Sequence, residues 1–184
     1  MRLNKWRTVE SKYIVKSRWL TLRADSCVTP EGVTVAPYYV LEYPDWAHIV
    51  ALDPTNRVLI TRQYRHGTGE ICTEIPCGEI EPGEDPMAAA RRELVEETGC
   101  AAESFELASC LFANPARQNN RVHCFLARGA RQTEKPTPDA SENIHCDFVS
   151  VPELLRMIDA GQLCQSLHVA SVLTALRKSG LPCV

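Results

Sequence analysis

The sequence predicts an α/β fold, an α/β/α sandwich with a mixed sheet and a β-strand extension at its N-terminus. Runs rich in β-branched and aromatic residues fill the first 43 positions, and further short apolar runs continue to residue 149. Helical patterns lie in mid-chain and near the C-terminus. We therefore expect an extension over residues 1–43 and one main domain over residues 44–184. With 184 residues, 45% of them hydrophobic, the chain can bury a sizeable core.

In the extension, strands are predicted at residues 6–15 and 19–28, and Pro30-Glu31-Gly32 predicts a hairpin turn into a third strand at 33–43. Exposed edges of such strands need protection, which favours pairing with a second copy of the chain.

The main domain is predicted to alternate strands with three helices. Strands are expected at residues 46–52, 57–65, 71–76, 105–112, 122–127 and 145–149. A long polar loop is expected at 128–143. The first helix begins after Asp85, a residue suited to cap it, has Pro86 at its first position and stops at Gly99. Two more helices are expected at 152–160 and 166–178.

Composition excludes several classes of function. A net charge of −3 gives no support for general binding to nucleic acid or to an anionic membrane surface, and no apolar run is long enough for a membrane span. The nine cysteines are scattered singly without a CxxC pair, so we expect free thiols in a reducing compartment. The opening residues lack the hydrophobic stretch of a secretory signal, and a cytoplasmic protein is expected.

Three carboxylates gather on one side of the first helix. Glu93 and Glu97 lie one turn apart with Glu96 beside them, away from the apolar stripe. Their mutual repulsion opposes folding, whereas Mg²⁺ or Mn²⁺ is usually bound by a few such carboxylates together with substrate phosphates. The alternative is a solvated acidic face in which Arg91 and Arg92 serve as partners.

The pattern of residues 78–100 favours a metal site over a solvated acidic face. These residues read Gly, five residues, Glu, seven residues, Arg-Glu-Leu, any residue, Glu-Glu, any residue, Gly and an apolar residue. This pattern resembles the Nudix box at every fixed position, and the resemblance implies a magnesium-dependent hydrolase on an α/β/α sandwich. The metal ligands that it implies are the backbone carbonyl of Cys77 and the side chains of Glu93, Glu96 and Glu97. Arg92 would orient the glutamates, and Glu84 would support them.

Features outside the box resemble the branch that hydrolyses ADP-ribose and other nucleoside diphosphate sugars. They are the N-terminal extension, Gln63-Tyr64-Arg65, the approach at 74–78, and Pro115, which lies 16 residues beyond Gly99. In this branch such a proline is associated with a preference for ADP-ribose, and Arg65 resembles a substrate-phosphate arginine. Relatives often have a glycine and an acid-arginine pair after the proline. This chain lacks them, so Asn119 or Asn120 is a candidate contact to a different sugar.

The resemblance also implies a glutamate that activates the attacking water from the loop near the C-terminus. Glu142 fits that role and Asp139 is the reserve candidate, so the expected catalytic residues are Glu142, Glu96 and Arg92. Candidates for an aromatic platform under the base are Trp6, Trp19, Tyr38 and Trp46.

The branch usually dimerises through its N-terminal strands, so we expect a homodimer that takes a small nucleotide-sugar substrate and a Mg²⁺ or Mn²⁺ cofactor. Two alternatives remain open at this stage, a house-cleaning nucleoside triphosphate pyrophosphatase and a non-catalytic Nudix module that senses a nucleotide.

Overall fold

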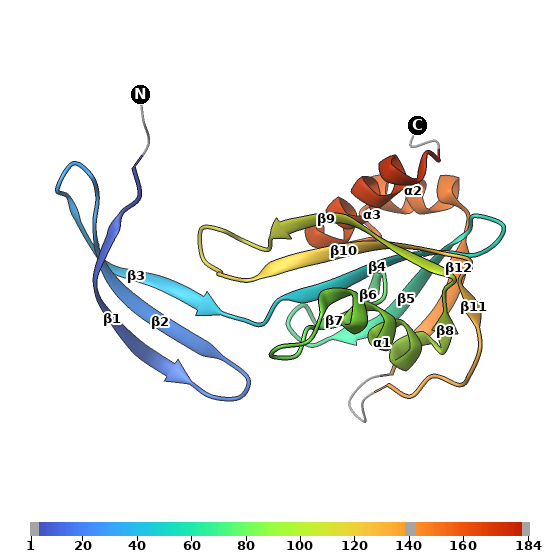
Figure 1. The fold of residues 1–184 in the computed structure, drawn as a ribbon, viewed down its shortest axis with the longest axis horizontal. Coiled ribbons are helices and arrows are strands. Elements are labelled where there is room, and N and C mark those ends of the chain that lie inside the picture. Colours follow the sequence, from blue (N-terminus) through green and yellow to red (C-terminus); the bar gives the residue numbers. More distant parts are fainter. Residues whose placement is uncertain (1–3, 139–142, 182–184) are drawn as a thin grey trace. The chain divides into compact units, whose positions relative to one another are not determined.

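The computed structural model describes residues 4–138 and 143–181, and the chain divides into two compact units (Figure 1). The first unit is drawn from residues 1–44 and 112–121, and the second from residues 45–111 and 122–184.

A three-stranded antiparallel sheet forms most of the first unit and confirms the predicted N-terminal β-extension. Its strands, in the order β1-β2-β3, are β1 (Arg7–Lys16), β2 (Thr21–Val28) and β3 (Thr34–Glu42). Every residue of β1 is exposed, and within the three strands only Asp25 and Cys27 are buried. Arg23 forms ion pairs with both Asp25 and Glu42, which compensates the buried carboxylate. The sheet therefore has little apolar core of its own.

The second unit is built on a mixed sheet of seven strands with the order β12-β5-β4-β10-β9 and with β6 and β7 paired to β5 and β4. Its strands are β4 (Trp46–Leu52), β5 (Val58–Arg65), β6 (Glu70–Glu74), β7 (Cys77–Glu79), β9 (Ser104–Phe112), β10 (Arg121–Arg128) and β12 (His145–Val149). β10 runs parallel to β4, whereas β5 is antiparallel to β4, β6 and β12. β7 is antiparallel to β4 and places Cys77 opposite His48.

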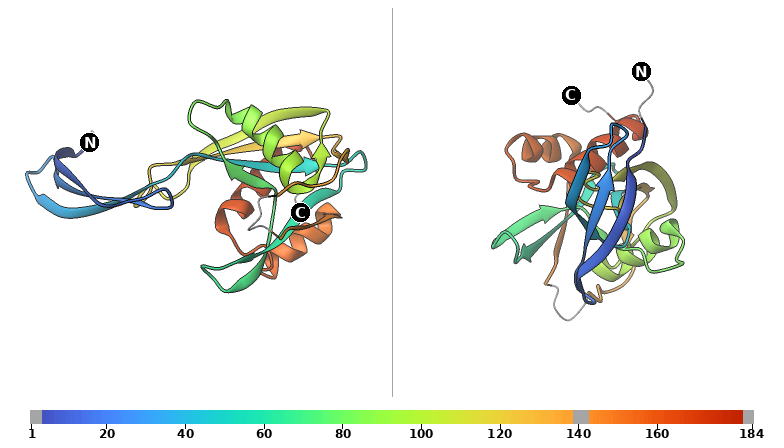
Figure 2. Two further views of the ribbon diagram at one scale, coloured as in Figure 1. Left: turned by 90° about the horizontal axis from the view of Figure 1, so that it is seen from below. Right: turned by 90° about the vertical axis from the view of Figure 1, so that its left-hand side faces the viewer.

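Side-chain alternation along the central strands divides the core into two halves. The helices are α1 (Pro86–Thr98), α2 (Val151–Asp159) and α3 (Ser166–Ser179). Ile49 of β4 belongs to a buried cluster with Leu94 of α1, whereas its neighbour Val50 belongs to a second cluster with Leu154 of α2 and Val172 of α3. Helix α1 thus covers one face of the sheet and the C-terminal helices cover the other, which confirms the predicted α/β/α sandwich (Figure 2).

The sequence prediction missed three short strands, β7 (Cys77–Glu79), β8 (Cys100–Ala101) and β11 (Arg131–Gln132). β11 pairs with β8, so the expected loop at 128–143 is not free of regular structure. Beyond β11, the N–H groups of Thr133 and Glu134 donate to the carbonyl of Gly99 at 2.8 and 3.2 Å. The first part of this segment is therefore held against the end of α1.

Candidate metal and active site

Local signals fix both ends of α1. The carboxylate of Asp85 accepts hydrogen bonds from the N–H groups of Met87 and Ala88, and Pro86 occupies the first helical turn. Gly99 ends the helix with φ of 67°, and an added Cβ there would lie 2.3 Å from the carbonyl oxygen of Glu134. Both caps fall where the sequence predicts them, so the register of the three glutamates on α1 is well defined.

Arg92 links the carboxylates of this helix. Its Nη1 donates to Oε1 of Glu93 at 2.7 Å and to Oε2 of Glu96 at 3.0 Å. On its other side the guanidinium donates to both carboxylate oxygens of Glu84, each at 3.0 Å, and to the carbonyl of Glu79. These hydrogen bonds, above all those to Glu84, raise the pKa of Arg92 and lower that of Glu84. Arg92 therefore contacts two of the three glutamates and is itself held by Glu84, while its role in orienting them stays a prediction.

Two carboxylates of α1 reach the backbone at the start of β7. The Cys77 N–H donates to Oε2 of Glu97 at 3.0 Å. The carboxylate of Glu93 packs against Gly78 so closely that a Cβ at residue 78 would lie 1.9 Å from its Cδ. The Cys77–Gly78 segment and α1 therefore form one site, and only glycine leaves room for Glu93 in this position.

Glu97 is the most buried of the three glutamates. Only 4% of its surface is exposed, which the helical spacing that places it on the flank of Glu93 and Glu96 does not indicate. Burial is tolerated because the Cys77 N–H binds its carboxylate. Glu96 stays half-exposed, so the three glutamates span a range from the core to the surface.

The donor set fits a hard divalent cation. Arg92 is one cation among four carboxylates, those of Glu84, Glu93, Glu96 and Glu97, so the cluster retains a net negative charge. Carboxylate and carbonyl oxygens of this kind are the ligands that Mg²⁺ and Mn²⁺ prefer. The cradle at Gly78 holds one of these carboxylates against the backbone.

Arg65 is held by a residue that the sequence analysis did not single out. Nε and Nη2 of Arg65 donate to the two carboxylate oxygens of Glu74 at 3.0 and 2.6 Å, and Gln63 donates to the same carboxylate. Glu74 is only 2% exposed, whereas the side chain of Arg65 is 41% exposed. These hydrogen bonds raise the pKa of Arg65, so its charge is permanent. The signal in the sequence that could have identified Glu74 is the presence of a glutamate inside the apolar run 71–75.

His48, Cys77 and His168 lie behind this site with their potential ligand atoms within 4.8 Å of one another. The two imidazole rings stack with centroids 4.4 Å apart, and both histidines are almost fully buried. Nδ1 of His168 accepts the Ile75 N–H at 3.2 Å, so the neutral ring carries its proton on Nε2 and offers no free lone pair to a cation. Burial raises the pKa of the Cys77 thiol. The group therefore fits a metal poorly and is better explained as hydrogen-bonded core.

Three predicted specificity residues belong to the first unit. Pro115 and Asn119 are exposed, and Oδ1 of Asn119 accepts the Tyr43 N–H at 3.1 Å. Asn120 is 1% exposed, and its side-chain amide has no hydrogen-bond partner among the described residues.

The aromatic candidates also differ in exposure. Trp6 and Trp19 are 49% and 76% exposed, whereas Tyr38 and Trp46 are half-buried. The candidate bases Glu142 and Asp139 lie outside the described residues.

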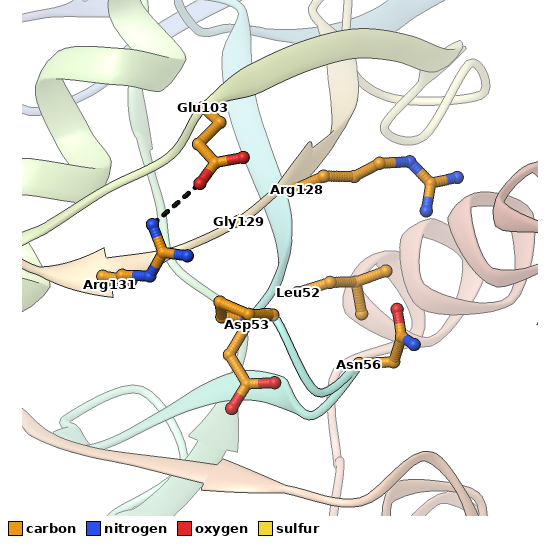
Figure 3. A pocket seen from close by; sticks show the side chains of 8 residues that line it. Leu52, Asp53, Asn56, Glu103, Arg128, Gly129 and Arg131 are labelled. Atoms are coloured by element: carbon orange, nitrogen blue, oxygen red, sulfur yellow. Dashed lines mark hydrogen bonds and ion pairs between the residues drawn. The ribbon is translucent and has the colours of Figure 1, made fainter.

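A separate cavity of about 310 Å³ opens beside the turn after β4 (Figure 3). Each of its four charged side chains has a partner: Arg131 binds Glu103 at 2.7 Å, Asp53 binds Arg57, and Arg128 donates to the carbonyl of Ser179. This cavity contains none of the carboxylates of α1 and is not part of the candidate site.

Within residues 4–138 and 143–181, none of the helices has the length and apolar character needed to cross a membrane.

All eight cysteines that the structure describes are free, as the sequence predicts.

Two family models match the chain. A family model described as the NUDIX domain matches residues 43–165, and one described as the nucleoside diphosphate sugar hydrolase N-terminal domain matches residues 6–41.

Relatives match most of the chain. The methanol dehydrogenase activator of Bacillus methanolicus is 28% identical, over 90% of this chain and 90% of that protein. The ADP-ribose pyrophosphatase of Mycobacterium tuberculosis is 29% identical, over 90% of this chain and 81% of that protein. The ADP-ribose pyrophosphatase of Bacillus subtilis is 24% identical, over 85% of each. A solved structure titled as an ADP compounds hydrolase matches 98% of both chains with a TM-score of 0.85 and 20% identity, which supports the fold.

Proposed function

Because the chain belongs to the NUDIX family, we propose that it hydrolyses the diphosphate linkage of ADP-ribose or a related nucleoside diphosphate sugar. The products would be a nucleoside monophosphate and a sugar phosphate. The observation that carries the proposal is the convergence of the Glu93 and Glu97 carboxylates on the Cys77–Gly78 backbone, with Arg92 joining Glu93 to Glu96. The match of the N-terminal sheet to a nucleoside diphosphate sugar hydrolase domain and the names of two relatives support this substrate class.

The proposed cofactor is Mg²⁺ or Mn²⁺, bound by Glu93, Glu96, Glu97 and the backbone carbonyl of Cys77. Such an ion supplies charge neutralisation for the diphosphate and acidifies bound water. Arg92 would keep two of the carboxylates oriented, and its ion pairs with Glu84 would hold it in place.

Arg65 is our proposed anchor for the diphosphate, since Glu74 fixes its planar guanidinium while part of the Arg65 side chain remains exposed. A water oxygen would attack phosphorus, the bridging P–O bond would break, and Glu142 is the proposed acceptor of the water proton. Pro115, Asn119 and Asn120 are proposed to select the sugar.

The decisive experiment is a substrate panel in Mg²⁺: ADP-ribose, GDP-mannose, ADP-glucose and UDP-glucose, together with nucleoside triphosphates. Products are identified by chromatography, and we expect a nucleoside monophosphate and a sugar phosphate from at least one of the sugar nucleotides. Free pyrophosphate from triphosphates alone would instead establish the house-cleaning alternative. Tight binding without any hydrolysis would establish the sensing module.

Glu97→Gln tests the site within that assay. The amide oxygen of Gln can still accept the Cys77 N–H, so the fold should survive while the negative charge is lost. We expect turnover to fall by roughly 100-fold or more, since metal-site charge supplies several kcal/mol to such reactions. Glu31→Gln, on an exposed turn, is the matched control.

We further propose a homodimer that forms through the N-terminal sheet, because every residue of β1 is exposed and several of its side chains are large and apolar.

We also propose a cytoplasmic location, which the free thiols support.

A further inference from the structure

A second cavity, of about 590 Å³, lies between β6 and the turn that joins α2 to α3. Cys72 of β6 and Cys164 of the turn both line it, together with Thr68 and Gln162. Cys72 is 5% exposed, whereas Cys164 is the one exposed cysteine among the eight described. The cavity therefore exposes one thiol to solvent and keeps the other next to it.

The two cysteines line the same cavity and their thiols interact with each other. The neighbouring Cys72 thiol raises the pKa of Cys164 through a side-chain hydrogen bond. The Thr68 hydroxyl lies 3.8 Å from Sγ of Cys72 on the other side. A disulfide needs the sulfur atoms to lie about 2.0 Å apart, so the two side chains must approach each other across the cavity that they line.

Both cysteines are positioned by regular structure. Cys72 is paired with Gln63 in the antiparallel β5–β6 ladder. On the other side, the turn is fixed by the hydrogen bond from the Gln162 N–H to the Met157 carbonyl at 2.8 Å and by the buried Leu163. Both cysteines therefore belong to segments that hydrogen bonds hold in place, and both line the same cavity.

We propose that Cys72 and Cys164 are a redox-active pair that forms an intramolecular disulfide by exchange with a small-molecule disulfide such as oxidised glutathione. The Cys164 thiolate attacks one sulfur of the glutathione disulfide and releases one glutathione, which leaves a mixed disulfide on Cys164. The deprotonated Cys72 then attacks the Cys164 sulfur and releases the second glutathione. Two protein thiols are oxidised, and one glutathione disulfide is reduced to two thiols. The new bond would join β6, two residues before Glu74, to the α2–α3 turn.

The test treats the full chain with oxidised glutathione at pH 8.5, where thiolate is more abundant, and then alkylates the remaining thiols. Mass spectrometry should show the loss of two hydrogens and seven alkylated cysteines of the nine in the chain, with Cys72 joined to Cys164 in the peptide map. The disulfide should raise Tm by roughly 5 to 10 °C, reversed by dithiothreitol, because it closes a long loop of the unfolded chain.

Three variants separate the steps. Cys72→Ser should stop at a stable glutathione adduct on Cys164, and Cys164→Ser should leave the shielded Cys72 unmodified. Cys146→Ser is the control. Cys146 has another cysteine, Cys100, as a neighbour, so this variant removes a second pair of neighbouring thiols and should still form the Cys72–Cys164 disulfide as the wild type does. A wild-type protein that keeps glutathione on Cys164, does not react, or joins a different pair would overturn the proposal. None of these readouts depends on hydrolysis, so the proposed function can fail or succeed independently.

Discussion

Gly78 has no side chain, and this allows the carboxylate of Glu93 to lie against the backbone at residue 78. The Cδ and both carboxylate oxygens of Glu93 lie 1.9 to 2.2 Å from where a Cβ of residue 78 would be. In Gly78→Ala the glutamate must therefore move away from the backbone. Because the atoms that must move are the far end of a flexible side chain, the fold should accommodate this movement, whereas the metal site should not.

For Gly78→Ala we expect Mg²⁺-dependent hydrolysis to fall by roughly 100-fold with a small change in Tm, since displaced ligands lose metal affinity by factors of this size. Gly67→Ala is the matched control because nothing lies within 4 Å of a Cβ at that position. Wild-type hydrolysis by Gly78→Ala would show that Glu93 does not act from this position.

Local sequence patterns predicted which candidate site residues lie together on one helix, because the spacing of residues along a helix fixes the direction in which each side chain points. They could not predict the pairs that join distant segments: the Glu97 carboxylate with the Cys77 N–H, and Arg65 with Glu74. The burial of Glu97 could not be predicted for this reason, since the helical period does not show that the Cys77 N–H lies within reach of its carboxylate. The placement of Cys72 and Cys164 on one cavity is equally non-local.

At the scale of elements, α1 was predictable because both of its ends carry specific residues. Asp85 caps two backbone N–H groups, and Gly99 adopts the left-handed conformation that ends the helix. The strands β8 and β11 have two residues each and β7 has three, too few to show a period of two. They form because neighbouring segments already lie alongside, as β7 does beside β4.

The cap of α1 gives a prediction at this scale. Asp85→Ala removes the acceptor for the Met87 and Ala88 N–H groups and should cost about 1 kcal/mol of unfolding free energy. Thermal unfolding should therefore show a Tm roughly 2 to 4 °C lower. Asp85→Asn keeps an acceptor oxygen and should stay close to the wild type. Equal losses in the two variants would mean that the charge, and not the hydrogen bonds, stabilises the helix start.

At the scale of the whole molecule, the exposed apolar side chains of the first unit lead to the expected dimer. Ile14 of β1 is 51% exposed and belongs to a strand without buried residues. Size-exclusion chromatography with light scattering should give twice the mass of one chain for the wild type, and Ile14→Glu should shift it toward the monomer. Ile71→Glu, at a 66% exposed site in the second unit, should remain dimeric. A monomeric wild type would contradict the proposal.

The buried histidines couple the stability of the whole molecule to pH. Burial, together with the charge of Arg65, lowers the pKa of His168 to about 3, and burial also lowers the pKa of His48. His168 is therefore neutral in the folded protein, whereas the unfolded chain takes up a proton below about pH 6.5. The unfolded state binds more protons between pH 6.5 and 3, so stability is complete above this window and falls as the pH drops through it.

Between pH 7 and pH 5, His168 alone should reduce the unfolding free energy by about 2 kcal/mol. Urea unfolding in EDTA at both pH values measures this loss without contributions from bound metal. In His168→Asn the loss should be smaller by that amount, because an amide oxygen can replace Nδ1 as the acceptor of the Ile75 N–H but cannot titrate. His145→Asn, at an exposed position, should follow the wild-type pH dependence. A constant difference between wild type and His168→Asn at the two pH values would mean that His168 is already protonated in the folded protein, or that its proton uptake is not linked to unfolding.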